Sequence, residues 1–354
     1  MRKLIRAIAV GAALAGCTKP AAAPQPAGTL DVYVIDVEGG QAVLARTPSG
    51  QSVLLDAGFP GDGTFASKPG NPATARDAQR ILAAARDARI TRIDYLITSH
   101  YHADHLGGVM ELAQLLPIGT FVDHAPPSAE AETAVPGTRA LYDAYAALRP
   151  RGKHVQPKPG DRLAIGGGLE AVVVAIDGAV LPAPLAGAGQ QNPSCREAVP
   201  AQEKTENPLS LAVILEYGRF RLLDPGDLSD APLHALTCPV NRIGIVDAYL
   251  VAHHGGNDGS DSALFTAAKP RAAIMSNGPR KGAQAATIRT INQRTLIDGW
   301  QLHKTTYRDS LNVPDERIAN LDLTTSAWIK LSASVDGSFT VTNARTGVTK
   351  RYPR

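Results

Sequence analysis

Four side chains able to bind metal ions lie within six residues of one another. The segment 98–108 contains His100, His102, Asp104 and His105 in the order His-Tyr-His-Ala-Asp-His. Imidazole and carboxylate together suit zinc, iron or manganese. In a loop that follows a strand, side chains at this spacing can diverge towards two neighbouring cations. We therefore predict two divalent metal ions, with zinc favoured over manganese or iron.

Further acidic and histidine-bearing segments occur at predicted strand ends elsewhere in the chain. Asp56 lies in Leu-Leu-Asp-Ala-Gly, Asp227 in Pro-Gly-Asp, and His253 precedes His254 and two glycines. A chance cluster of surface polar residues would lack such partners. The pair at 107–108 is Gly-Gly, which would let the chain turn tightly beneath the ligands.

On these motifs the chain resembles the metallo-β-lactamase superfamily, whose hallmark is His-x-His-x-Asp-His, and the resemblance extends over nearly the whole chain after residue 30. Within the superfamily it is most similar to the branch of the competence-protein metallo-hydrolase domain. That branch carries Asp-Val-Gly-Gln-Gly after the first strand, altered here to Asp-Val-Glu-Gly-Gly-Gln at 36–41, and an Asn-x-x-Ser, here Asn207-Pro-Leu-Ser210.

The resemblance implies two metals that share a bridging carboxylate, Asp227. The first metal would be bound by His100 and His102. The second would be bound by Asp104, His105 and either His253 or His254. The chain departs from the superfamily at the third ligand of the first site, where many members have a histidine and this sequence has Asn207. An amide oxygen binds zinc more weakly than imidazole does. The first site is then looser or takes a ligand from elsewhere, such as His124, and a single-metal enzyme remains an alternative.

Several other residues are weaker candidates. Asp36 and Asp56 at strand ends could each hold a ligating histidine by a hydrogen bond, or be turn residues; the first role is favoured for Asp56. His124 could support the site or lie on the surface. Asn277 and Lys281 follow a predicted strand, where Lys281 could bind a phosphate or carboxylate, or be a solvated loop residue.

These features favour a metal-dependent hydrolase. A bound metal lowers the pKa of water from about 15.7 towards 7, and Asp104 could orient that water as well as bind the metal. The expected substrate contains an ester-type bond, with a phosphodiester or phosphate-bearing molecule favoured. A lactone or β-lactam hydrolase is one alternative, and a non-catalytic metal-binding envelope protein is another.

The first residues predict export. Arg2, Lys3 and Arg6 precede an apolar run that is too short to span a bilayer, and Leu-Ala-Gly-Cys17 resembles a bacterial lipoprotein signal. We expect residues 1–16 to be the signal, Cys17 to be lipidated, and 17–29 to be a Pro/Ala-rich linker. The protein would then be anchored on the periplasmic side of the outer membrane.

The charge and the remaining cysteines fit this compartment. The three basic residues of the signal account for the whole formal net charge of +3, so the mature chain has no basic surplus for nucleic acid. The expected partner is a small-molecule or envelope-derived substrate, with membrane contact through the lipid alone; nothing in the sequence indicates the oligomeric state. In an oxidising compartment Cys195 and Cys238 can form a disulfide.

The elements expected to position these residues alternate between strand and helix. Strands are predicted at 30–37, 42–47, 52–56, 93–98, 120–124, 169–176, 209–216, 219–223, 245–252, 272–276, 328–331 and 339–342, and helices at 74–88, 109–116, 138–148, 262–268 and 285–297. Residues 177–207 are predicted to be a long irregular loop. The order fits a single α/β domain over 30–354: a four-layer αβ/βα sandwich of two mixed β-sheets flanked by helices.

Overall fold

The computed structural model describes residues 28–195, 203–257, 261–307 and 311–354. The predicted signal peptide, Cys17 and most of the linker lie outside these ranges. Among the described residues, no helix has the length and apolar character needed to cross a membrane.

The first sheet has nine strands in the order β18-β17-β16-β1-β2-β3-β4-β5-β6. Its strands from β3 to β6 run parallel, and the others pair antiparallel. Their bounds are β1 Leu30–Val34, β2 Val43–Arg46, β3 Ser52–Leu55, β4 Ile93–Ile97, β5 Ile118–Val122, β6 Lys153–Val155, β16 Ile329–Ala333, β17 Phe339–Asn343 and β18 Thr349–Tyr352.

The second sheet follows the order β15-β14-β13-β12-β11-β10-β8-β7, with β9 paired to β8. Here β11 to β15 are parallel. The bounds are β7 Arg162–Gly166, β8 Leu169–Ile176, β9 Ala179–Val180, β10 Ala212–Tyr217, β11 Phe220–Asp224, β12 Ala248–Leu250, β13 Ala272–Met275, β14 Asp298–His303 and β15 Ile318–Asn320.

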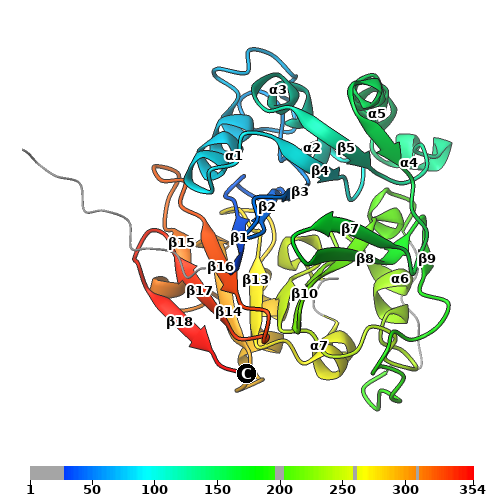
Figure 1. Ribbon diagram of the computed structural model, residues 1–354, viewed down its shortest axis with the longest axis vertical. Coiled ribbons are helices and arrows are strands. Elements are labelled where there is room, and N and C mark those ends of the chain that lie inside the picture. Colours follow the sequence, from blue (N-terminus) through cyan, green and yellow to red (C-terminus); the bar gives the residue numbers. More distant parts are fainter. Residues whose placement is uncertain (1–27, 196–202, 258–260, 308–310) are drawn as a thin grey trace, which may run out of the picture.

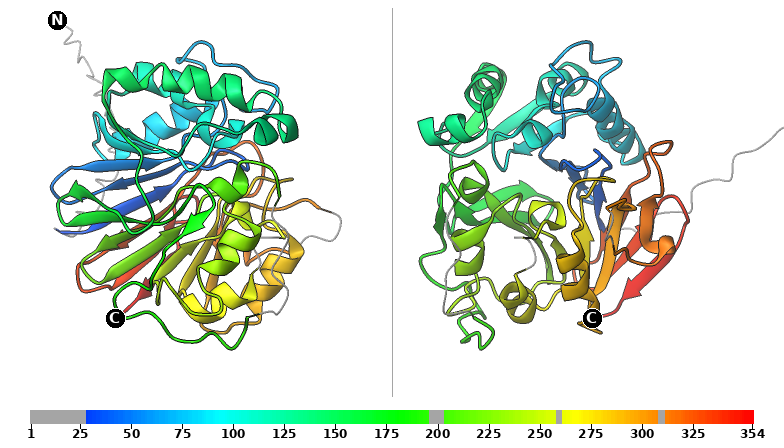
Figure 2. Two further views of the ribbon diagram at one scale, coloured as in Figure 1. Left: turned by 90° about the vertical axis from the view of Figure 1, so that its right-hand side faces the viewer. Right: turned by 180° about the vertical axis from the view of Figure 1, so that it is seen from behind.

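Helices cover the outer face of each sheet, so the molecule has the four layers predicted (Figures 1 and 2). The first sheet carries α1 Arg76–Asp87, α2 Ala103–Leu106, α3 Val109–Leu115, α4 Ala129–Ala134 and α5 Thr138–Ala146; the second carries α6 Asp230–Ala235, α7 Ser262–Ala268 and α8 Ala285–Asn292. Short 3-10 turns lie at η1 Arg149–Arg151, η2 Asn207–Leu209, η3 His253–Gly255 and η5 Asp315–Arg317.

The apolar side chains of the strands supply both interfaces of each sheet. In β1, Val32 and Val34 belong to the core between the sheets, whereas Tyr33 belongs to the core under the helices. This alternation follows from the two-residue period of a strand. The second sheet packs its other face on Leu233, Phe265 and Ile288 of α6, α7 and α8.

Two sequence predictions about elements need correction. The helix predicted at 285–297 ends at Asn292, and the chain turns into the parallel strand β14, which was not predicted. The described part of the long loop at 177–207 contains the short strand β9 and then lies along residues 239–242. Leu185 N donates to Arg242 O at 2.8 Å, and Gly189 N donates to Asn241 O at 2.8 Å.

Candidate metal centre

The predicted ligand segments meet where the parallel strands of both sheets end. Asp56 follows β3 and the histidine segment follows β4 in one sheet; Asp227 follows β11 and His253 follows β12 in the other. Carboxyl ends of parallel strands share one edge of a sheet, and in open α/β sheets binding sites form there. The packing of two such sheets brings both sets of ligands to one place.

The histidine segment is only partly a loop. His100 lies in extended chain after β4 and His102 is the N-cap residue of α2, as expected for a loop. Asp104 and His105, however, lie on α2 itself, where both are buried. From α2, His105 reaches Asp227 and His254 of the second sheet while its ring stays 4.2 Å, centroid to centroid, from that of His100.

The glycines at 107 and 108 serve a different purpose from the one predicted. Gly107 has φ −58° and Gly108 has φ −75°, values that any residue adopts. Neither position has room for a side chain. A Cβ on Gly108 would lie 2.2 Å from the carbonyl oxygen of Ala57, and a Cβ on Gly107 would lie 2.2 Å from Pro60 Cδ. The two glycines let α2 and α3 pack directly on the chain after β3.

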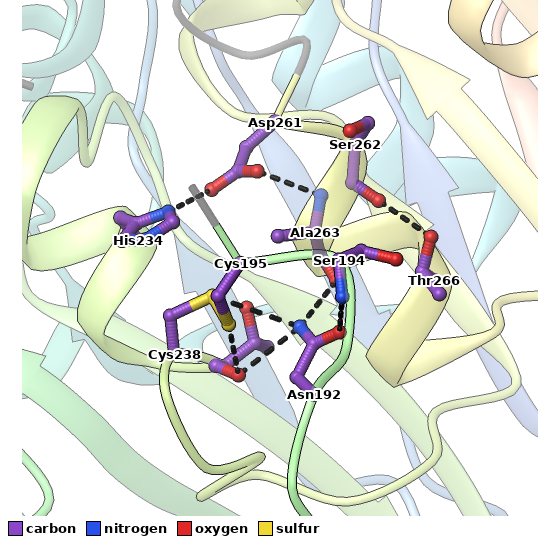
Figure 3. The surroundings of a disulfide bond; sticks show 10 residues. Asn192, Ser194, Cys195, His234, Cys238, Asp261, Ser262, Ala263 and Thr266 are labelled. Carbon is purple, nitrogen blue, oxygen red and sulfur yellow. Dashed lines mark hydrogen bonds and ion pairs between the residues drawn. A yellow bond between two sulfur atoms is a disulfide. The ribbon is translucent and has the colours of Figure 1, made fainter. Parts of the chain in front are cut away.

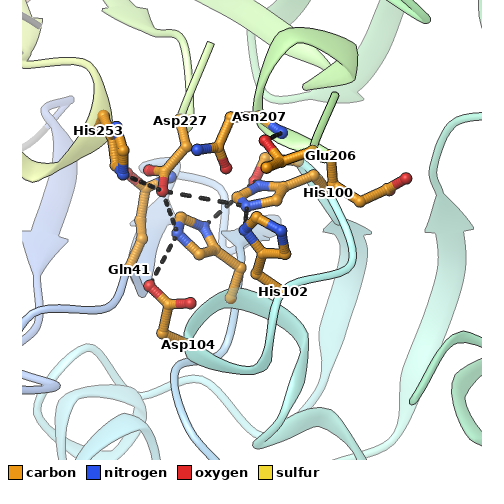
Figure 4. A network of polar contacts seen from close by, with 12 residues as sticks. Gln41, His100, His102, Asp104, Glu206, Asn207, Asp227 and His253 are labelled. Carbon is orange, nitrogen blue, oxygen red and sulfur yellow. Dashed lines mark hydrogen bonds and ion pairs between the residues drawn. The ribbon is translucent and has the colours of Figure 1, made fainter. Parts of the chain in front are cut away.

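Four buried donor atoms converge closely enough to share one metal ion. They belong to Asp104, His105, Asp227 and His254, and Figure 4 shows the surroundings of Asp104 and Asp227. His105 Nε2 lies 3.2 Å from His254 Nε2, 3.2 Å from Asp227 Oδ2 and 3.4 Å from Asp104 Oδ2. His254 Nε2 lies 3.2 and 3.3 Å from the same two oxygens. A tetrahedral ion with ligands at about 2.0–2.1 Å has donor–donor edges of about 3.3–3.4 Å, so the donors fit one metal.

The charges of this cluster also call for a cation. Burial alone would raise the pKa of Asp104. The positive charges of Lys281 and His105 outweigh this effect and hold the pKa well below its usual range. Burial would also raise the pKa of Asp227. The pKa is nevertheless lowered, because positive charge on His105, His254 and His253 favours the carboxylate. Two buried carboxylates that stay ionised need positive charge beside them. Lys281 Nζ provides part of it through a direct contact with Asp104 Oδ2.

Asp56 orients His105 rather than joining the four donors. Its Oδ2 contacts His105 Nδ1 at 2.7 Å and accepts from Ser99 Oγ at 2.7 Å. Gln41 Nε2 donates to the same oxygen at 3.1 Å and, at 3.1 Å, to Oδ1 of Asp224. The contact fixes the tautomer of His105 with a proton on Nδ1, which leaves Nε2 as a ligand. This is the role that sequence favoured for Asp56.

The predicted first site is less complete. His100 Nε2 lies 3.0 Å from His102 Nδ1 and 4.0 Å from Asp227 Oδ2. Burial lowers the pKa of both histidines, and for His100 the neighbouring histidines lower it further. Three buried atoms here, His102 Nε2, Asn207 Oδ1 and Asp227 Oδ1, have no hydrogen-bond partner among the described residues. Figure 4 shows Asn207 near Asp227 and His100. Buried polar atoms without a protein partner commonly bind a water or an ion.

The structure separates the two adjacent histidines. His254 is buried and belongs to the four-donor cluster, whereas the side chain of His253 is 29% exposed and its Nε2 lies 3.7 Å from Asp227 Oδ2. Both residues have positive φ, 50° and 56°. A non-glycine residue in this region costs about 1–3 kcal/mol and is typical of functional sites.

Other predicted residues lie elsewhere. His124 is buried between Asp177 Oδ1 and Glu206 Oε2, each at 3.3 Å, and stacks on Tyr101; these contacts, not a metal ligand set, account for its position. Asn277 donates to the carbonyl of His303 at 2.7 Å, so its amide links β13 to β14 instead of facing a substrate. Asp36 binds His303 at 2.8 Å and Arg80 at 3.1 Å.

Sequence reasoning missed Ser99, Gln41 and Asp224 as parts of the site. Ser99 Oγ contacts both Asp56 and His100 Nδ1, the latter at 2.9 Å. Burial raises the pKa of Asp224 to about 7, against the opposing hydrogen bond from the Gly226 amide. The signal for Asp224 was its place three residues before Asp227, and that for Gln41 was its place at the end of the 36–41 motif; Ser99 carried no signal beyond its neighbours.

A cavity of about 410 Å³ opens beside the cluster. His253, Lys281, Arg280, Gln284 and Tyr307 are among its lining residues. Arg280 is exposed and forms no ion pair with any described residue. The cavity therefore presents two cationic side chains next to the metal-binding atoms.

Comparison with known proteins agrees with this arrangement. The family model described as "Metallo-beta-lactamase superfamily" matches residues 35–180. No curated protein matches the chain in sequence.

Solved structures show only distant likeness. A putative metal-dependent hydrolase from Parabacteroides distasonis is 12% identical over 76% of this chain and 92% of its own, with a TM-score of 0.41. Zn(2+)-bound PqqB from Methylobacterium extorquens is 13% identical over 76% and 97%, also at 0.41. MEM-A1, a subclass B3 metallo-beta-lactamase from a soil metagenome library, is 14% identical over 64% and 78%, at 0.38. At these values the likeness carries no information on substrate or mechanism.

The matched segment includes Asp56 and the whole histidine segment, while Asp227 and His254 follow it in the same fold. Residues 35–180 therefore match the model of the metallo-β-lactamase superfamily, in a chain whose described residues form two mixed sheets flanked by helices and carry a His/Asp cluster able to hold a metal.

Proposed function

We propose that this protein is a metal-dependent hydrolase that cleaves an ester-type bond in a phosphodiester or other phosphate-bearing substrate. The observation that carries the proposal is the four-donor set of Asp104, His105, Asp227 and His254 beside a cationic cavity, which Lys281 lines while it contacts Asp104. A divalent metal held there would supply a water whose pKa is lowered from about 15.7 to about 7, a nucleophile at neutral pH.

The residues of this chain supply the remaining functions. Asp104 Oδ2 is held by His105, His254 and Lys281, so its carboxylate is fixed in place to orient the attacking water. Arg280 and Lys281 line the cavity and would bind the anionic group of the substrate, since a guanidinium and an ammonium pair well with phosphate oxygens. The resemblance of residues 36–41 and Asn207-Pro-Leu-Ser210 to the competence-protein branch also supports a phosphate substrate.

Zinc is the metal we propose for the four-donor site, because imidazole and carboxylate donors at tetrahedral spacing suit it. A second ion would use His100, His102, Asp227 and the amide oxygen of Asn207, with weaker binding. We also propose an exported, lipid-anchored protein that meets a small or envelope-derived substrate. The disulfide between Cys195 and Cys238 supports an oxidising compartment.

The proposal is tested by metal analysis paired with a substrate panel. The purified chain is loaded with zinc, and bis(p-nitrophenyl) phosphate, p-nitrophenyl phosphate, a lactone and nitrocefin are supplied separately. We expect chelator-sensitive hydrolysis of a phosphate ester. Hydrolysis of nitrocefin or the lactone alone would show that the substrate class is wrong. A zinc-loaded chain that cleaves none of the four would support a non-catalytic metal-binding protein.

The role of the cavity is tested with Arg280→Gln. The lost cation would contact only the substrate, so KM for the phosphate ester should rise while kcat changes little. The expected rise is about 10-fold, which corresponds to the loss of one charge-assisted hydrogen bond. Arg289→Gln removes an exposed arginine of α8 and serves as the matched control. Equal KM values for the two variants would contradict anion binding by Arg280.

A further inference from the structure

A second group of metal-binding side chains lies at the C-terminal end of α6. The structure joins Cys195 and Cys238 in the disulfide predicted from sequence, and His234 lies beside it (Figure 3). One ring nitrogen of His234 and the two sulfurs all lie within 4.8 Å of one another. His234 and Cys238 are each only 6% exposed.

We propose that this group is a redox-controlled metal site, in which the reduced thiolates of Cys195 and Cys238 bind a zinc-type divalent ion together with His234. The site is separate from the cluster around Asp227 and does not depend on the function proposed above.

The spacing along the chain supports this assignment. His234 and Cys238 are four residues apart, and Cys238 N donates to His234 O at 3.0 Å, so the backbone retains helical geometry between them. Structural zinc sites use this spacing, with pairs of ligands separated by three to five residues. The Cα atoms of the two cysteines lie 5.6 Å apart, close enough for thiolates at about 3.8 Å, the edge that zinc–sulfur bonds of about 2.3 Å require.

Neighbouring polar groups already support the ligands. Asp261 contacts His234 Nδ1 at 3.1 Å, which orients the ring and leaves Nε2 for a metal (Figure 3). A carboxylate on the other nitrogen is the usual support of a ligating histidine. Asn192 Nδ2 lies 3.7 Å from Cys238 Sγ and donates to it, an interaction that would stabilise a thiolate.

The chemistry balances with an external reductant. A phosphine takes up oxygen from one water and becomes its oxide, while the disulfide accepts two electrons and two protons to give two thiols. Binding of a divalent ion then releases both thiol protons. Either cross-link, the disulfide or the metal, ties the chain at Cys195 to the end of α6, the helix that follows Asp227.

Cobalt tests the proposal, because thiolate ligation gives Co²⁺ a near-ultraviolet charge-transfer band that His/Asp ligation does not. The full chain carries Cys17→Ser, so that only the paired cysteines can supply thiols. Co²⁺ is added before the phosphine, so that the metal can replace the disulfide as it opens, and circular dichroism follows folding. We expect the band to appear at one equivalent on reduction and to be absent from the oxidised chain.

His234→Asn separates a built site from two thiols that bind metal by chance. In the reduced variant we expect the affinity for Co²⁺, followed by the same band, to fall at least about 10-fold. Absence of the band from reduced protein, a band unchanged by His234→Asn, or a reduced chain that unfolds despite bound Co²⁺ would each overturn the proposal.

Discussion

Individual residues decide how well this centre can hold a metal. Nδ1 of His105 faces the carboxylate of Asp56 at 2.7 Å, and this contact orients the ring from which the distances to the other three donors are measured. Asp56 itself has φ +57°, a conformation that a residue with a Cβ adopts at a cost. The chain keeps an aspartate there because glycine could not hold the imidazole.

We predict that Asp56→Asn lowers metal affinity 10- to 100-fold, the usual effect of removing the support of a ligating histidine. An amide can donate to Nδ1, which would move the proton to Nε2 and block the donor. Isothermal titration with zinc measures the change.

Asp36→Asn is the matched control for this variant. Asp36 is also fully buried and also contacts a histidine, but that histidine is His303 rather than a donor of the cluster. We expect it to reduce stability while zinc affinity stays within about twofold. Equal losses of affinity in both variants would show that Asp56 acts through stability alone.

At the scale of elements, helix α2 carries two of the four donors, Asp104 and His105. Gly108 packs on the carbonyl of Ala57 without a side chain, which lets the chain after α2 lie close to the chain after β3. The amide of Gly108 also donates to the carbonyl of Gly58 at 3.0 Å, which ties the start of α3 to the chain after β3.

We predict that Gly108→Ala destabilises the protein by about 1–3 kcal/mol, because the new methyl would lie 2.2 Å from a backbone oxygen and force α2 to move. The same shift should lower zinc affinity, since Asp104 and His105 move with the helix. Urea unfolding and zinc titration measure both effects.

Gly70→Ala provides the comparison, because its nearest heavy atom lies 3.9 Å from the new Cβ. We expect a change within about 0.5 kcal/mol. If Gly108→Ala changed the free energy of unfolding as little as Gly70→Ala does, close packing of α2 on the chain after β3 would not position the ligands.

Sequence patterns predicted most of these elements and part of the site. Short runs such as β3 and β13 are buried on both faces, and their composition alone indicates strands. Strand β14 was not predicted because polar Gln301 and His303 are buried in it by hydrogen bonds and ion pairs with residues distant in sequence. Tertiary contacts of this kind leave no local pattern.

The metal-binding residues, too, could be predicted only in part from the sequence. The spacing in the histidine segment and the place of Asp227 after a strand were enough to identify donors. The choice between His253 and His254 depends on two successive positive φ angles, which sequence does not reveal. Gln41 joins the site through Asp224, 183 residues away, a pairing that only the packed sheets create.

At the scale of the whole molecule, buried charge should make stability depend on pH. His124 lies between Asp177 and Glu206; although burial would lower its pKa, these carboxylates raise it from 6.5 to about 9. The folded state therefore binds this proton more tightly than the unfolded state does. The stabilisation is complete below pH 6.5 and is lost as the pH rises through 9.

We predict that the free energy of unfolding of metal-free protein falls by up to about 3 kcal/mol across this range. In Glu206→Gln one of the two carboxylates is lost, so the fall should still begin near pH 6.5 but should be smaller and should end at lower pH. Urea unfolding across the range measures both profiles. Superimposable pH profiles would show that His124 does not bind the proton in this way.

The division of the four donors between two sheets has a consequence for how the protein is made. Asp104 and His105 belong to the first sheet, whereas Asp227 and His254 come from the second, more than a hundred residues later. During synthesis on the ribosome the first half emerges with an incomplete set of ligands. We expect metal capture to wait until the later half has been translated and has docked, so that acquisition of the ion marks a finished chain and a fragment ending near residue 180 binds zinc poorly.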